Sequence, residues 1–460
     1  MRQTDAAVAA NRFGLGAKPG QLGTQGSDAR DALRAQLEGP APLIGATLPA
    51  SHSVVAAAQA RRDNAAGANA QVRPGADVVN AAQTVREIYA PAHAAEMLAR
   101  YRHAVATERS FVERLVHFWS NHFAVSVDKL AVLGLAGAME REAIRPHVLG
   151  NFADLLLAVE QHPAMLLYLD NQQSMGPNST AARQADRRGR ELGLNENLGR
   201  EILELHTLGV GGGYSQQDVR ALATIISGWS VGGGQGRQRG GEPGRFHFRA
   251  AFHEPGAQVL LGKRHADDGV RQGERALRDL ALQPATARHL ATKLVRHLVA
   301  DDPPAALVEQ VAAAYLRADG DLPSTYRALL AAEQSWEQPL AKFKTPSDYI
   351  HSAWRALELP VAPRDPRLFE QLGQPQLRPG SPAGWPDRSA DWDSGAALMK
   401  RLEWAQEQGA MLGSRRNARQ VAAACLGAVW SPASDQAVAR AQDATQALAL
   451  LLAAPEFMRR

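Results

Sequence analysis

The sequence lacks several features that would place it in a specialised class of protein. Cys425 is its single cysteine, so an internal disulfide, and with it a small disulfide-stapled scaffold, is excluded. No segment approaches the roughly 18 uninterrupted apolar residues of a membrane-spanning helix. Hydrophobic residues make up 45% of the 460 positions and charged residues 21%, a composition too apolar for a disordered chain. The chain is therefore expected to fold as a globular protein.

Excess charge of one sign and familiar catalytic motifs are also missing. The 51 Lys and Arg residues oppose 47 Asp and Glu residues, and a net charge of +4 over this length produces a weak field. The densest basic run, 183–190, lies in a polar segment and favours a solvated loop, so no nucleic-acid partner is expected. The sequence contains no Walker A motif, no G-x-S-x-G elbow, no H-E-x-x-H and no cysteine-based metal spacing.

The first residues, MRQTDAAVAANRFGLGAKPG, show no apolar core of about 7–15 residues, which a secretory signal would need. We therefore expect a cytoplasmic protein by default. A periplasmic or exported location is the alternative if the true N-terminus lies upstream, and one cysteine suits either compartment.

Apolar residues recur at helical spacing through most of the chain, and the alternating pattern of extended strands is almost absent. The sequence predicts a mainly α protein: one large helical domain, 1–460, with long irregular loops and at most a small β element near 245–262. The segments expected to interrupt the helices are an exposed linker or loop at 62–80, a polar loop at 171–194, a Gly-rich loop at 232–244 and a Pro- and Trp-rich loop at 360–392. Long loops inside a compact domain are often functional.

The segment 108–123, ERSFVERLVHFWSNHF, predicts a helix whose apolar stripe includes Trp119 and His122. His117 lies five residues before His122, about 140° away around a regular helix, so the two cannot bind one ion. His122 is therefore a candidate for lining an internal site. The alternative is a core histidine that is hydrogen-bonded to a backbone carbonyl.

The segment 195–209, NENLGREILELHTLG, carries the most informative pattern. Its helix presents Arg200, Glu201 and Glu204 on one face. The two carboxylates are about 60° apart, so they can meet on one ligand, share a metal or raise one another's pKa for acid–base chemistry. A solvated face, on which Arg200 pairs with Glu204, is the alternative. His206 is about 140° from Glu201 and is not expected to share its face.

Two consecutive helices are predicted around this segment. The first, 195–208, is expected to be capped by Asn195, and the second, 216–229, by Ser215. Ser215 and Asp218 have the S-x-x-D spacing of a capping box. The two helices are expected to pack as an antiparallel hairpin.

Several segments, in a fixed order along the chain, resemble those of a bacterial family known only as domain of unknown function 1800. They are RFGLGA, HFWSNHF, LYLDNQ, NENLGREILELHTLGV with GYSQQDV, SGW, FHEPG with LLG, KFKTPSDYI, and GQPQLRP with SPAGWP. The resemblance covers nearly the whole chain, and HFWSNHF, NENLGREILELHTLG and GWP are specific in combination. It implies a mostly helical protein without an established activity, frequent export, and a frequently neighbouring gene for a sulfatase-like or phosphatase-like protein.

Two functions are compatible with these residues. The first is an enzyme, best interpreted as a carboxylate- or metal-dependent hydrolase acting on a polar substrate. Its catalytic residues would be Glu201, Glu204, His122 and Arg200, and a divalent metal ion would be held by Glu201, Glu204, His122 and His253, the last from the FHEPG turn. The second is a non-enzymatic assembly or interaction protein that works with a sulfatase- or phosphatase-like partner. An enzyme should bring these side chains into one concave pocket, whereas a docking protein should bury them and expose apolar patches elsewhere.

Overall fold

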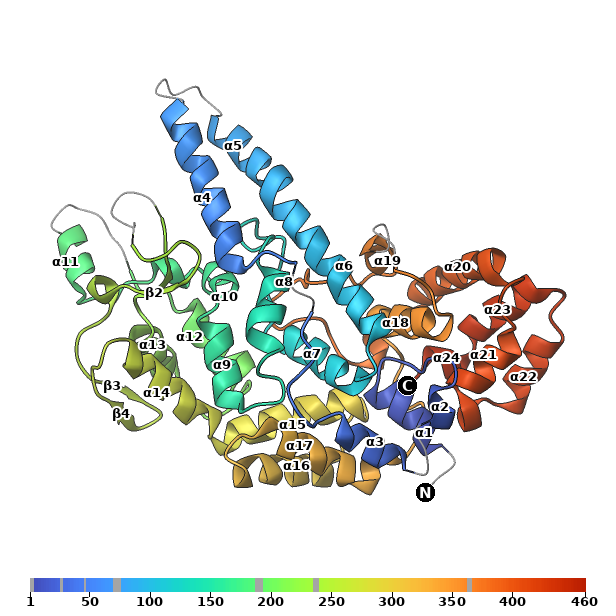
Figure 1. Ribbon diagram of the computed structural model, residues 1–460. Coiled ribbons are helices and arrows are strands. Elements are labelled where there is room, and N and C mark those ends of the chain that lie inside the picture. Colours follow the sequence, from blue (N-terminus) through green and yellow to red (C-terminus); the bar gives the residue numbers. More distant parts are fainter. Residues whose placement is uncertain are drawn as a thin grey trace.

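The computed structural model describes residues 4–24, 28–44, 47–68, 76–186, 193–234, 240–361 and 366–460. Helix greatly exceeds strand in this part of the chain, which confirms the mainly α fold class (Figure 1). The molecule is elongated, with the short strands toward one end and the last helices of the chain at the other.

The first part of the chain forms the central helices and a projecting arm. Its helices, with η marking 3-10 and π segments, are α1 (Asp5–Val8), η1 (Ala9–Phe13), α2 (Gln21–Thr24), α3 (Ala29–Ala35), α4 (Ser51–Ala68), α5 (Ala76–Thr84), η2 (Val85–Tyr89), α6 (Ala90–Ala106), α7 (Ser110–His122), α8 (Ala136–Met139), η3 (Glu140–Ile144), α9 (Phe152–Glu160), α10 (Pro163–Tyr168), η4 (Asn171–Gln173) and α11 (Thr180–Asp186). Helix α7 lies in the interior because its apolar stripe, including Phe111, Leu115 and Trp119, is fully buried.

The middle of the chain adds a helix pair, the strands and a second set of helices. Its elements are α12 (Asn197–Glu201), η5 (Ile202–His206), α13 (Gln216–Ile225), β1 (Trp229–Val231), β2 (Phe246–Phe248), η7 (Ala250–Phe252), β3 (Gln258–Leu260), β4 (Lys263–His265), α14 (Val270–Ala281), α15 (Pro284–Leu298), α16 (Ala305–Arg317), α17 (Leu322–Ala331) and η8 (Glu333–Trp336). Strands β1 and β2 pair antiparallel, as do β3 and β4. The expected small β element is therefore present, although it begins before residue 245 and ends after residue 262.

The last part of the chain packs against the N-terminal helices. Its elements are α18 (Pro346–Ala356), α19 (Pro366–Gln371), η9 (Ser389–Asp391), α20 (Gly395–Leu412), α21 (Ala418–Cys425), η10 (Gly427–Val429), α22 (Pro432–Ala439), α23 (Ala444–Ala453) and α24 (Pro455–Met458). Cys425 is buried here, and burial raises the pKa of its thiol to about 12.

Much of the segment predicted as an exposed linker, 62–80, is helical, so that prediction is wrong for the residues that the structure describes. Helix α4 continues to Ala68 and α5 begins at Ala76, while 69–75 lie outside the described residues. The segment is rich in alanine, the strongest helix former, and helix propensity here outweighs the lack of apolar residues to bury. The two helices project from the body as an arm (Figure 1).

Of the other three predicted loops, 232–244 and 360–392 are largely irregular where they are described, whereas more than half of the described part of 171–194 is helical. The segment 171–194 contains η4 and α11, and residues 187–192 lie outside the described part. Residues 235–239 of the Gly-rich segment also lie outside the described part, and so do residues 362–365. The segment 360–392 contains α19 and η9.

The predicted pair of helices around residues 195–229 forms with shorter bounds. The capping box of Ser215 and Asp218 is confirmed at the start of α13. The preceding helix begins at Asn197, and the side chain of Asn195 accepts a hydrogen bond of 2.9 Å from the backbone N–H of Asn197. Its second half, η5, is a π-helix, in which hydrogen bonds join residues five apart. Helix α13 ends at Ile225 because the chain turns there to enter β1.

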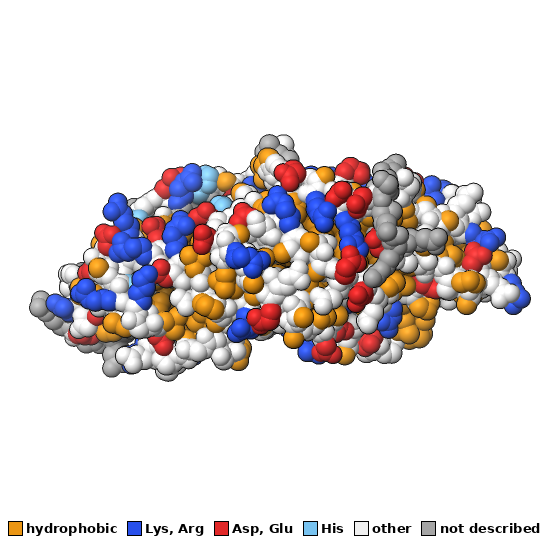
Figure 2. Space-filling model, turned by 90° about the horizontal axis from the view of Figure 1, so that it is seen from below, with side chains coloured by type: hydrophobic (Ala, Val, Ile, Leu, Met, Phe, Trp, Pro, Cys, Tyr) orange, Lys and Arg blue, Asp and Glu red, His pale blue; other side chains and the backbone are white. Residues whose placement is uncertain are grey.

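The surface seen from below carries positive and negative side chains interspersed with scattered apolar ones (Figure 2). This mixture agrees with the nearly balanced composition of the sequence. None of the described helices has both the length and the apolar character needed to cross a bilayer.

Candidate active site

His122, at the end of α7, is buried and faces a second histidine. Its Nε2 donates a hydrogen bond of 3.1 Å to the backbone carbonyl of His206. Burial lowers the pKa of His122 well below 6.5, and the nearby charge of Lys293 lowers it further. The ring is therefore neutral at neutral pH. His122 therefore matches the alternative expected from the sequence, a core histidine that is hydrogen-bonded to a backbone carbonyl. Its ring also borders a cavity.

His206 was not expected to share a face with Glu201, and the π-helix η5 changes that geometry. Residues five apart come onto one side of a π-helix, and the charge of His206 acts on the pKa of Glu201. The Nδ1 of His206 lies 2.7 Å from Oε1 of Glu160, and both side chains are fully buried. Neither this pair nor the register shift could be read from the sequence ILELH.

Glu201 and Glu204 are half-buried. Burial raises the pKa of Glu201, with a lowering effect from His206 and a raising effect from the neighbouring charge of Glu204. Arg200 pairs with Glu196, at 3.2 Å, and with the side chain of Gln216, so no ion pair with Glu204 forms. The partial burial of both carboxylates is compatible with a site, and their catalytic role stays a prediction.

His253 has a separate set of neighbours. Its Nδ1 donates to the carbonyl of Ser227 at 3.0 Å, and its Nε2 lies 3.8 Å from Asp267. Within the described residues, no three His, Cys, Asp or Glu side chains are placed so that they could hold a metal ion. The structure therefore does not bring Glu201, Glu204, His122 and His253 together as one metal centre.

The most promising concavity lies between α7, α15 and residues 379–392, which we call the Trp–Pro loop. Two adjoining cavities, of about 80 and 260 Å³, share five lining residues, Asn121, His297, Trp385, Pro386 and Asp387. We refer to the two together as the α7–α15 cleft. His117 lines the smaller cavity and His122 the larger one, so the two histidines of α7 face different parts of the cleft.

The Trp–Pro loop is fastened to α7 by Asn121. The side chain of Asn121 donates to the carbonyl of Trp385 at 2.9 Å and accepts from its backbone N–H at 2.8 Å. Gly384 packs directly on this contact, with φ of +81°, and a Cβ there would lie 2.3 Å from the backbone oxygen of Asn121. These hydrogen bonds thus hold together two of the segments on which the family resemblance rests, HFWSNHF and GWP.

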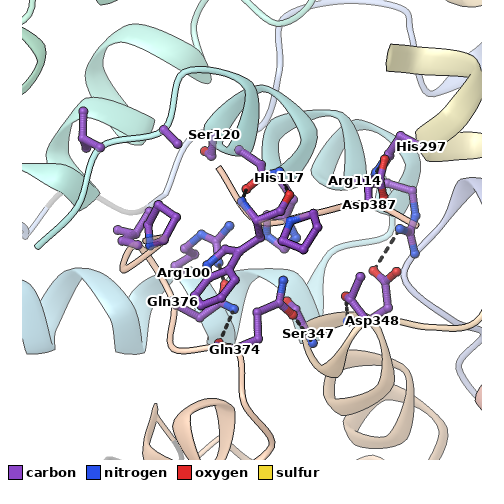
Figure 3. Close-up of a pocket in the computed structure, with 18 residues that line it drawn as sticks. Arg100, Arg114, His117, Ser120, His297, Ser347, Asp348, Gln374, Gln376 and Asp387 are labelled. Carbon is purple, nitrogen blue, oxygen red and sulfur yellow. Dashed lines mark hydrogen bonds and ion pairs between the residues drawn. The ribbon is translucent and has the colours of Figure 1, made fainter. Parts of the chain in front are cut away.

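The fastened loop delivers Asp387 to His297 on α15. The Nδ1 of His297 lies 3.1 Å from both carboxylate oxygens of Asp387 and donates to them. Lys342 supports the loop by donating to the carbonyl of Asp387 at 2.6 Å. Figure 3 shows His297 and Asp387 beside Arg114 at one end of the smaller cavity, with Arg100 at the other.

Electrostatics set the protonation of this pair. Burial lowers the pKa of His297, although the charge of Asp387 opposes the shift. Burial raises the pKa of Asp387, but His297 and Lys342 outweigh it and lower the pKa to about 2. At neutral pH the pair is therefore a carboxylate and a neutral imidazole with its proton on Nδ1. Nε2 then carries a lone pair, and it has no hydrogen-bond partner among the described residues.

A network of buried ion pairs supports the floor of the cleft. Arg145 contacts Glu113 at 2.5 Å and Glu140 at 3.1 Å, and Arg100 contacts Glu140 at 2.7 Å. At the other end of the smaller cavity, Arg114 contacts Asp348 at 2.9 Å. Paired and hydrogen-bonded buried charges of this kind hold their side chains in fixed positions.

A family model described as protein of unknown function (DUF1800) matches residues 8–459. The chain belongs to the DUF1800 family. The match includes α7, α15 and the Trp–Pro loop, so the cleft lies within the DUF1800 region. No curated protein and no solved structure is detectably similar to the chain.

In this DUF1800 chain, the residues that sequence reasoning missed are His297, Lys293 and Asp387. Lys293 and His297 have the i, i+4 spacing that places two side chains on one face of a helix. That spacing is common on solvated helix surfaces, so it does not predict a site without the contact between His297 and Asp387. Asp387 directly follows the GWP motif, which the family resemblance includes, although nothing in the sequence marks Asp387 itself.

Proposed function

We propose that this chain is a hydrolase in which His297, oriented by Asp387, acts as a general base on a polar substrate bound in the α7–α15 cleft. The observation that carries the proposal is the hydrogen bond from His297 Nδ1 to Asp387, which leaves the buried Nε2 as the basic nitrogen of a histidine that lines both cavities. A carboxylate that fixes the tautomer of a histidine and stabilises its imidazolium is a recurrent device in hydrolysis.

The surroundings of His297 favour water as the nucleophile. Among the described residues, no serine, threonine or cysteine is hydrogen-bonded to its Nε2. In the proposed step, Nε2 takes a proton from a water whose oxygen attacks the electrophilic atom of the substrate. The imidazolium then gives that proton to the leaving group, and Asp387 stays ionised throughout.

The carboxylates that the sequence emphasised, Glu201 and Glu204, line neither cavity of the cleft, so we propose them as a separate acid–base group outside its lining. Glu201 has a raised pKa, which suits a proton donor, and it lies close to the buried pair of His206 and Glu160. The metal-dependent form of the hydrolase, which requires His253, has less support because His253 contacts other partners.

An interaction protein working with a sulfatase- or phosphatase-like partner is the second candidate. The observations in its favour are the projecting arm of α4 and α5 (Figure 1) and three exposed apolar side chains on α20, Leu398, Met399 and Met411. It differs from the first candidate because it requires no chemistry at His297.

The experiment is a hydrolysis assay of the purified chain on a panel of chromogenic carboxylic, phosphoric and sulfuric esters. His297→Gln and Asp387→Asn should each reduce the rate by about 10²- to 10⁴-fold, the usual contribution of a positioned base. His147→Gln is the matched control, because the side chain of His147 donates to the carbonyl of Ala143 and lines neither cavity of the cleft. Equal rates for the His297 and His147 variants would refute the assignment of the base.

The pH profile provides a second readout. The base works only when it is deprotonated, and burial places the pKa of His297 below 6.5. Activity should therefore be retained at pH 6.5 and fall as the pH decreases through that lowered pKa. A profile that rises only above pH 7 would contradict the assignment.

A further inference from the structure

We propose that the α7–α15 cleft binds an oxyanion group of its substrate and that the Nζ of Lys293 is the anion contact. The inference rests on the proposed function of the cleft and names the class of substrate it takes: a molecule that carries a carboxylate, sulfate or phosphate group.

Lys293 is placed for this role by α15. It lies one turn before His297, and the spacing of four residues puts both side chains on the same face of the helix. Both line the larger cavity, together with His122 from α7 and Asp387 from the Trp–Pro loop. An anion held by Lys293 would therefore lie in the same cavity as the proposed base.

None of the hydrogen bonds and ion pairs formed by the described residues includes the ammonium group of Lys293, although it has three protons to donate. Asp387 is the nearest candidate to neutralise it, but that carboxylate is bound by His297 at 3.1 Å and lies 3.8 Å from Lys342. Other polar side chains of the cleft, such as Asn121, Arg114 and Asp387, have protein partners. The ammonium group of Lys293 is thus an unpaired charged donor in a cavity, and an anionic ligand would satisfy it.

The charge around the larger cavity is positive. Lys293, Arg296 and Arg388 line it, against the two carboxylates Asp387 and Asp391. Asp387 already accepts hydrogen bonds from His297 and lies 3.8 Å from the cation of Lys342, so it leaves little negative potential for a cationic ligand. The site therefore favours an anion over a cation or a neutral molecule.

Part of the wall is apolar, and this strengthens the expected contact. Phe118, Ala383, Trp385 and Pro386 line the same cavity. A charge-assisted hydrogen bond is stronger where such side chains exclude water. Burial also lowers the pKa of Lys293 to about 8, and the raising effect of the Asp387 charge does not outweigh it.

The charged and titratable groups that face Lys293 come from four elements. They are His289, Arg296 and His297 on α15, His122 on α7, His206 on η5, and Asp387, Arg388 and Asp391 on the Trp–Pro loop. His122, His289 and His297 have no charge near pH 8, because burial holds their pKa values below 6.5. The pKa of Lys293, about 8, therefore lies above the pKa values of these three histidines.

The experiment measures binding of sodium sulfate, sodium phosphate and sodium acetate to the full purified chain by calorimetry, with chloride used to keep the ionic strength constant. The wild type should bind at least one of these anions. Lys293→Met, which keeps the length of the side chain and removes its charge, should weaken that binding by about tenfold or more. Lys293→Arg should retain it, and Lys263→Met is the control, because Lys263 is 62% exposed and pairs with Asp279.

A pH series sharpens the test. Anion affinity of the wild type should fall as the pH rises above about 8, where free Lys293 loses its proton, and anion binding should be coupled to proton uptake. The Lys293→Arg variant should show no such fall below pH 10, because a guanidinium keeps its charge there. This comparison does not depend on the folding of Lys293→Met, which circular dichroism checks separately.

The outcomes separate this inference from the proposed hydrolase. The His297→Gln variant should still bind the anion while it loses hydrolysis, so a failure of the hydrolase leaves the anion site standing. Absence of binding by every probe, or equal binding by the folded Lys293→Met variant, would overturn the anion site. Tighter binding of acetate identifies a carboxylate substrate, and tighter binding of sulfate or phosphate identifies a tetrahedral one.

Discussion

Replacing Asn121 by alanine should release the Trp–Pro loop from α7 without unfolding the protein. The change removes two hydrogen bonds, of 2.9 and 2.8 Å, to the backbone of Trp385. Each such bond contributes about 0.5–1.5 kcal/mol net, so the docked loop should lose about 1–3 kcal/mol. This corresponds to about 5- to 150-fold faster hydrogen exchange at the amide of Trp385. Asp387 lies two residues further on, so its contact with His297 should weaken as well.

The matched control is Asn417→Ala. Asn417 caps α21 by accepting a hydrogen bond from the backbone N–H of Gln420, and it does not line the cleft. Loss of this cap costs about 0.5–2 kcal/mol, so both variants should show a similar decrease in the free energy of unfolding in urea. Only Asn121→Ala should also speed exchange at Trp385 and lower hydrolysis. Unchanged exchange at Trp385 in that variant would refute the idea that Asn121 holds the loop.

Three further changes test other parts of the structure. Ser215→Ala removes the cap of α13 and should lower the free energy of unfolding by about 0.5–2 kcal/mol; an unchanged melting midpoint would contradict the cap. Glu201→Gln replaces a carboxylate whose pKa is raised by burial, so stability at pH 7 should stay the same or increase while activity falls; a clear loss of stability would argue for a purely structural role. Glu113→Gln leaves the buried Arg145 with Glu140 as its remaining partner and should cost about 3–5 kcal/mol, whereas Glu309→Gln in an exposed pair should cost at most about 1 kcal/mol. Burial raises the pKa of Glu113, but Arg145 outweighs it and holds that pKa well below 4.5. The contribution of Glu113 is therefore present above about pH 5 and is lost as the pH falls below the unfolded value of about 4.3; equal acid unfolding of the wild type and Glu113→Gln would contradict it.

The fold could be predicted where local rules decide the structure. The stripe of α7 and the capping box at Ser215 depend on residues three or four positions apart, and both form as expected. The linker prediction at 62–80 is wrong for the described residues because the helix propensity of alanine outweighs the polar composition of the segment. The π-helix at 202–206 carries no local signal, and it decides which side of the helix His206 occupies.

The candidate site could be predicted only in part, because its decisive contact is not local. His122 stood out as a polar residue in an aromatic stripe, and it does border the cleft. His297 and Asp387 are 90 residues apart in the sequence, and each alone resembles a surface residue. Their meeting depends on the path of the Trp–Pro loop across α7, which Asn121 and Gly384 determine.

The burial of Cys425 makes the natural chain a ready background for site-specific labelling. Its thiol is buried and its pKa is about 12, so almost none of it is the reactive thiolate at the pH of maleimide coupling. A cysteine introduced at the exposed Ser381, at the start of the Trp–Pro loop, can therefore carry a fluorophore or spin label without removal of the native one. Such a probe would report directly whether the loop opens when a ligand enters the cleft.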